Sequence, residues 1–138
     1  MKKILISLCA GILLILAAAL CACGDKNDGT YYPPFEEMKT NLESKGYTVV
    51  LDGDLSDDDA NKRGGTMLSA RKTDEYLFFY RLDNAADCDY FYNVLEEECA
   101  DYNSLVKIAN DEKYGNIVYC GTADAVDAAG IKVVNVKV

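Results

Sequence analysis

The sequence predicts an α+β fold, with an antiparallel or mixed sheet of five to six strands and two main helices on one face. Two observations carry this prediction. Two segments with helical spacing alternate with short β-branched and aromatic runs, and the connections between them are mostly of hairpin length. The part of the 138-residue chain that follows the apolar N-terminal segment is long enough for one small domain with a single core.

The first helix is expected after two prolines, which suit its first turn. Phe35, Met38 and Leu42 lie on one helical stripe, and Gly46 suits the position after the helix end. Three β-branched or aromatic runs then predict strands at 47–51, 66–71 and 76–82. The last of these runs is mostly apolar on both sides, which is typical of a central strand.

The second helix is expected from Asn84 to Asp101, because Asn84 and Asp87 have the spacing of a capping box. Its apolar stripe consists of Cys88, Phe91, Leu95, Cys99 and Tyr102. Glutamates occupy positions 96–98 on the other side, so we expect Leu95 to be buried against the strand at 76–82. Further strands are predicted at 105–109, 116–120 and 131–138, with a short helix from Thr122 to Gly130.

The N-terminal segment carries a targeting signal. Two lysines precede an uncharged apolar run at 4–22, which ends in the sequence LCAC at 20–23 and is followed by Gly24. This ending resembles the lipobox of bacterial lipoproteins. The resemblance implies cleavage before Cys23 and attachment of a diacylglyceryl group to its thiol, which anchors the chain in the cell membrane. The alternative is an uncleaved N-terminal membrane helix, and both place the domain on the extracytoplasmic face.

The domain boundaries follow from this signal. We expect residues 1–22 to be a signal peptide, 23–33 a polar tether behind the lipid anchor, and 34–138 a single α+β domain. The order of helices and strands is similar in style to that of small lipoprotein domains of uncharacterised function.

The charge balance excludes one class of partner. Lys and Arg number 14 against 23 Asp and Glu, so nucleic acid, whose phosphates are bound by clustered basic side chains, is not an expected partner. The chain has no His, the commonest general base and metal ligand. We therefore expect no cofactor and no enzymatic activity.

The acidic loop after residue 51 is the one candidate metal site. It contains Asp52, Asp54, Asp57, Asp58 and Asp59, and carboxylates are ligands of Ca²⁺. Neither EF-hand frame through the loop places Gly and Glu where that motif needs them, and a frame starting at Asp25 has Gly29 one place too early. A solvated acidic loop is the favoured interpretation, and a weak calcium site of another kind is the alternative.

Three cysteines remain beyond the signal: Cys88, Cys99 and Cys120. Cys88 and Cys99 lie ~16 Å apart along an intact helix, whereas a disulfide needs Cα atoms within about 7 Å. Either one can meet Cys120 if the helix covers that strand. The favoured interpretation is nevertheless three buried thiols that act as small hydrophobic residues, with a disulfide to Cys120 as the alternative.

The expected function is a lipid-anchored binding or accessory module of a bacterial cell envelope, with a protein or peptide partner and no catalysis. The alternative is an enzyme inhibitor or immunity-type protein that presents an acidic face to a basic partner. A concave pocket favours the first and a flat acidic face the second. The ten tyrosines are interpreted as core residues in preference to a sugar-stacking surface.

Overall fold

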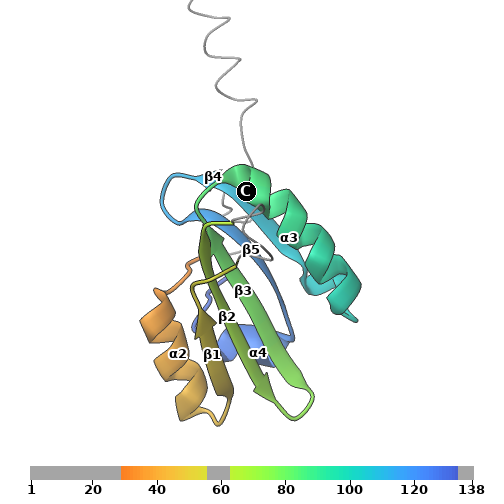
Figure 1. The fold of residues 1–138 in the computed structure, drawn as a ribbon. Coiled ribbons are helices and arrows are strands. Elements are labelled where there is room, and N and C mark those ends of the chain that lie inside the picture. Colours follow the sequence, from red (N-terminus) through yellow and green to blue (C-terminus); the bar gives the residue numbers. More distant parts are fainter. Residues whose placement is uncertain (1–28, 56–62, 134–138) are drawn as a thin grey trace, which may run out of the picture.

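The computed structural model describes residues 29–55 and 63–133 (Figure 1). Its elements are α2 (Phe35–Ser44), β1 (Thr48–Asp52), β2 (Gly65–Lys72), β3 (Glu75–Leu82), α3 (Ala85–Glu98), the 3-10 helix η1 (Tyr102–Ser104), β4 (Val106–Asp111), β5 (Gly115–Gly121) and α4 (Ala123–Ala128). The predicted α+β class is confirmed. None of the helices in these two ranges is long and apolar enough to cross a membrane.

The five strands form one antiparallel sheet with the order β1-β2-β3-β5-β4. β3 lies in the middle of this order, as its two apolar sides predict. Phe79 of β3 is paired with Leu68 on one neighbour and with Tyr119 on the other. These cross-strand pairs put large apolar side chains side by side at the centre of the sheet, where they exclude water most completely.

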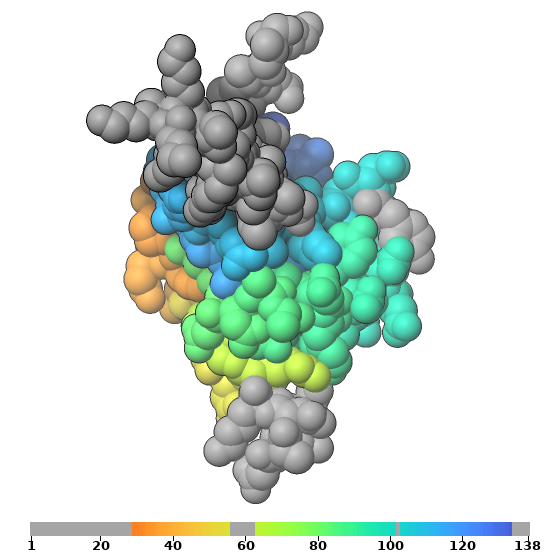
Figure 2. Space-filling model, turned by 90° about the horizontal axis from the view of Figure 1, so that it is seen from above, coloured from red at the N-terminus to blue at the C-terminus, as the bar shows by residue number. Residues whose placement is uncertain are grey.

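Both faces of the sheet are covered by helices. Leu77 and Phe79 pack toward α2 and α4, whereas Tyr80 and Leu82 of the same strand pack toward α3. Figure 2 shows α2 in orange and α3 in green to teal on opposite sides of the molecule. The expectation that both main helices share one face is therefore wrong. A strand that is apolar on both sides needs a cover on both, because each side must be removed from water.

On one face, α2 follows its sequence pattern closely. Met38 and Leu42 have no exposed surface, and Gly46 takes a φ of +90° just after the helix end. That conformation is open to glycine at little cost, and it turns the chain directly into β1.

The segment before α2 is part of the packed domain. Tyr32 is 3% exposed, and Tyr31 forms a two-bond β-bridge with Lys132, with N···O distances of 2.8 and 3.0 Å. The guanidinium of Arg81 donates a hydrogen bond to the Pro33 carbonyl at 2.7 Å. The last residues of the expected tether, from Thr30 onward, thus belong structurally to the domain.

On the other face, α3 begins as predicted and ends earlier. The backbone N–H of Asp87 donates to Asn84 Oδ1 at 3.1 Å, and Asn84 Nδ2 donates to Asp87 Oδ2 at 2.9 Å. Leu95 is 2% exposed, which confirms the predicted buried side. The helix stops at Glu98 instead of Asp101, because Cys99 has extended backbone angles and is bonded to Cys120.

Candidate binding groove

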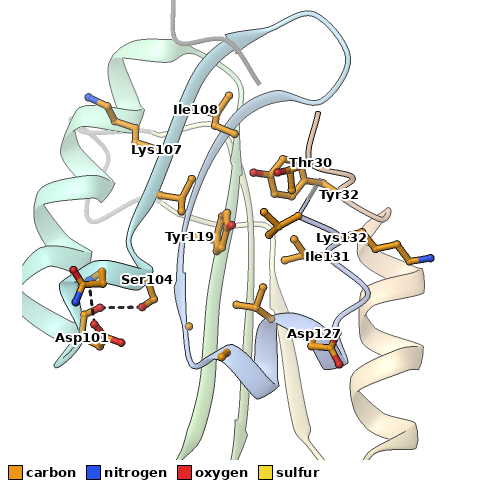
Figure 3. A pocket seen from close by; sticks show the side chains of 16 residues that line it. Thr30, Tyr32, Asp101, Ser104, Lys107, Ile108, Tyr119, Asp127, Ile131 and Lys132 are labelled. Atoms are coloured by element: carbon orange, nitrogen blue, oxygen red, sulfur yellow. Dashed lines mark hydrogen bonds between the residues drawn. The ribbon is translucent and has the colours of Figure 1, made fainter. Parts of the chain in front are cut away.

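A concavity of about 900 Å³ lies on the face that carries α2 and α4 (Figure 3). α2 packs against β1 and β2, and α4 packs against β3. On the same face, β5 forms the floor of the concavity and β4 forms one of its sides. We call this hollow the groove; it is lined by parts of the segments 30–32, 101–108, 119–121, 123–127 and 131–133.

The floor of the groove is formed by well-packed apolar residues. Tyr119 of β5 is 5% exposed, and its ring stacks on Phe79 with centroids 5.5 Å apart. Tyr32 contacts both rings at centroid distances of 5.8 Å. These tyrosines are core residues, as expected, and they hold the floor in one arrangement because an aromatic cluster of this kind has few alternative packings.

Two extended segments form the long sides of the groove. On one side, Val106 and Ile108 are two residues apart on β4 and so point to the same face. On the other side, Ile131 and Val133 have the same spacing in a segment held by the Tyr31–Lys132 bridge. Val133 is 54% exposed, so the groove presents apolar surface to solvent.

One end of the groove is acidic. Asp101 and Asp127 both line it there, and Ser104 lies beside Asp101 in Figure 3. The Asp101 carboxylate accepts a hydrogen bond from the Asn103 N–H at 3.0 Å, which fixes its position at the start of η1. The opposite end, formed by Thr30 and Tyr32, carries no charged side chain.

The two lysines of the lining extend away from the groove in Figure 3. Lys107 reaches to the other face of the sheet, where its Nζ lies 2.7 Å from Asp89 Oδ1 on α3. Lys132 points outward toward α2. The remaining charged residues of the lining are Asp101 and Asp127, and both are exposed.

The Cys99–Cys120 disulfide positions the acidic end. It fastens the end of α3 to β5, two residues before Asp101. The sequence left open whether Cys120 pairs with Cys88 or Cys99, and the structure selects Cys99. Cys88 keeps a free, buried thiol, and burial raises the pKa of this thiol to about 11. The interpretation as three buried thiols is thus wrong for two of the three cysteines.

The site residues singled out from the sequence do not form the groove. Asp52 accepts a hydrogen bond from the Asp54 N–H at 2.9 Å in an exposed turn, whereas Asp57, Asp58, Asp59 and Cys23 lie outside the described residues. Within 29–55 and 63–133, no three Asp, Glu, Cys or His side chains gather as a metal site would require. The calcium alternative has no support in that part of the chain.

The groove has no local signature in the sequence, because its lining comes from segments far apart in the chain. The two-residue apolar spacing at 106–108 and 131–133 predicts strands and does not by itself indicate a groove. No protein-family model, curated protein or solved structure matches the chain.

Proposed function

We propose that this chain is a lipid-anchored binding or accessory module on the extracytoplasmic face of a bacterial cell membrane, with no catalysis of its own, and that the groove is its ligand site. The observation that carries the proposal is the groove. A packed aromatic floor, apolar sides and one acidic end together make a concave surface of the kind that binding sites use.

Two features support the location. The LCAC ending at 20–23 is followed within a few residues by the packed domain. The Cys99–Cys120 disulfide is typical of proteins that fold outside the cytoplasm, where thiols are not kept reduced.

The anchor is tested by Cys23→Ser in the full chain. We expect an uncut precursor without an acyl group, because the substitution removes the thiol that accepts the lipid. Intact mass and detergent partitioning measure both effects. A mature chain that begins elsewhere, or one without an acyl mass, contradicts the proposed anchor.

The groove is tested by placing a photo-crosslinking amino acid at Val133 in the full chain on intact cells. The same amino acid at Val50 is a matched control, since both side chains are 54% exposed and Val50 lies on β1 at the other end of the sheet order. We expect an adduct from position 133 that is absent from position 50. It should disappear when Val106→Arg fills the groove and persist with Val50→Arg.

Equal labelling from positions 133 and 50 contradicts a ligand site in the groove. A third position, Glu97 on the exposed side of α3, tests the inhibitor alternative. An adduct from position 97 alone would instead favour a protein that meets its partner through an acidic face.

A further inference from the structure

We infer that the ligand of the groove is a peptide segment in extended conformation, with aliphatic side chains at alternate positions and a basic group at the end near Asp101 and Asp127. This inference rests on the proposed function and adds the chemical class of the ligand. It follows from the shape of the groove sides, from the negative charge at the end that carries Asp101 and Asp127, and from the burial of the aromatic rings in the floor.

The shape of the sides selects an extended chain. Val106 and Ile108 on one side, and Ile131 and Val133 on the other, repeat every second residue. Val106 is half-buried and Val133 is 54% exposed, so these two offer apolar surface from opposite sides, whereas Ile108 and Ile131 are buried behind them. A β-strand places its side chains with a period of two, so an extended peptide between the two sides can set alternate residues against Val106 and Val133.

The acidic end selects the charge. Asp101 and Asp127 line the groove at this end, and the lysines of the lining point away from it. The whole chain has a formal net charge of −9. An ammonium or guanidinium group at this end is therefore attracted both by the two nearby carboxylates and by the overall field of the protein.

Two other occupants fit the same surface less well. Sugars bind flat against exposed aromatic rings, but Tyr32 and Tyr119 are only 3% and 5% exposed. A second copy of this chain would bring another surplus of acidic groups to the acidic end, and like charges repel.

The test uses the full chain in detergent and three kinds of amidated, fluorescent peptide of about six residues, a length that matches the six residues of β4. The first alternates valine and threonine and carries a lysine at one end, made in both directions. The second has glutamate in place of lysine. The third contains the residues of the first with its valines grouped together. Fluorescence anisotropy measures each Kd.

We expect the alternating lysine peptide to bind about five- to tenfold more tightly than the glutamate peptide, since exposed charge pairs contribute at most about 1 kcal/mol each. Asp101→Asn with Asp127→Asn should remove this difference, because both changes keep the shape and remove the charge. The matched control, Glu96→Gln with Glu97→Gln on α3, should leave it unchanged. Val133→Thr should weaken binding, and Val50→Thr should not.

Three results would overturn the inference: equal Kd values for the lysine and glutamate peptides, equal values for the alternating and grouped peptides, or an adduct from position 133 to another part of the same chain. If cells yield a groove adduct that is not a peptide, the proposed function stands and the peptide class is wrong. If position 133 gives no specific adduct and no peptide binds, both are wrong.

Discussion

The two faces of the sheet differ in how completely they are covered. On one face, the 14-residue α3 packs across β3, β5 and β4. On the other, α2 with 10 residues and α4 with 6 cover the side of β1, β2 and β3, and the groove lies over β5 and β4. The first face thus serves mainly stability, whereas the second is divided between a core and an open concave surface.

This difference shows how a small domain can combine a closed core with an open concave surface. β5 belongs to both: Val118 and Cys120 face α3, and Ile117 and Tyr119 face the other side. Because side chains alternate along a strand, the same seven residues support the closed face and form the groove floor. Substitutions on the two faces should therefore have separable effects.

The largest effect is expected under α3. Leu95→Ala removes a side chain that is 2% exposed and leaves a cavity, which together cost ~2–5 kcal/mol of unfolding free energy. Chemical denaturation measures the change. Glu97→Ala, on the exposed side of the same helix, should change stability by less than ~0.5 kcal/mol. A Leu95→Ala protein as stable as the parent would show that the closed face does not carry the stability.

The Cys99–Cys120 disulfide should contribute somewhat less to the unfolding free energy than the Leu95 side chain. It closes a loop with a sequence separation of 21 residues, for which chain entropy gives about 3 kcal/mol. The double variant Cys99→Ala, Cys120→Ala removes the link without leaving a reactive thiol and should lower the denaturation midpoint accordingly. Since the bond also fixes the segment that carries Asp101, we expect a smaller preference for the lysine peptide. An unchanged preference would mean that η1 is held by other contacts.

Two titrating groups, one on each face, give a pH-dependent comparison. On the α2 side, burial and a hydrogen bond to the Glu75 carboxylate raise the pKa of Tyr47 from 10.0 to about 12. Folding therefore favours the protonated phenol. The contribution of this phenol to the unfolding free energy is complete below pH 10 and is lost as the pH rises toward 12. Tyrosinate absorbance of the parent, compared with Tyr47→Phe, measures this titration; a residue-47 signal with a midpoint near 10 would contradict it.

Under α3, burial raises the pKa of the Cys88 thiol from 9.0 to about 11. The stabilising effect of the protonated thiol is complete below pH 9 and is lost as the pH rises toward 11. At pH 8 the native protein should react slowly with a thiol reagent and the denatured protein quickly, because the reactive species is the thiolate. Rapid labelling of the native protein would show that α3 opens frequently.

The smallest effect on stability is expected at the groove rim. Val133→Thr keeps the β-branched shape of a side chain that is 54% exposed, so the unfolding free energy should change by less than ~0.5 kcal/mol. Val50→Thr should behave in the same way. A stability loss of more than ~1 kcal/mol for Val133→Thr alone would indicate that the groove side is part of the core.

Local patterns predicted most of the elements and few of the contacts between them. The stripe through Phe91 and Leu95 and the capping pair at Asn84 and Asp87 located α3, because these signals lie within one helix. The apolar runs located all five strands. The end of α3 was misplaced, since the periodic pattern continues past the residue at which Cys99 turns toward its partner strand.

The placement of helices on both faces of the sheet is also contained in the sequence. The strand at 76–82 is mostly apolar on both sides, and this pattern already implies a cover on both faces. The groove is different. Its sides come from β4 and from the segment after α4, which are brought together only by tertiary structure, and no local pattern records that juxtaposition. The predicted strand at 131–138 lies within the described residues only as far as Val133, where Lys132 pairs with Tyr31.

The bridge between Tyr31 and Lys132 has a consequence for where a ligand can be captured. If Cys23 carries the lipid, Thr30 at the uncharged end of the groove is seven residues from the anchor. A fully extended chain of that length reaches ~25 Å. A lipid on Cys23 would therefore keep this end of the groove within about 25 Å of the headgroups, and a ligand of the groove would have to reach that layer. Additional residues between Cys23 and Thr30 would enlarge the volume accessible to the groove and lower its effective concentration near the membrane. No residue of the groove itself would change.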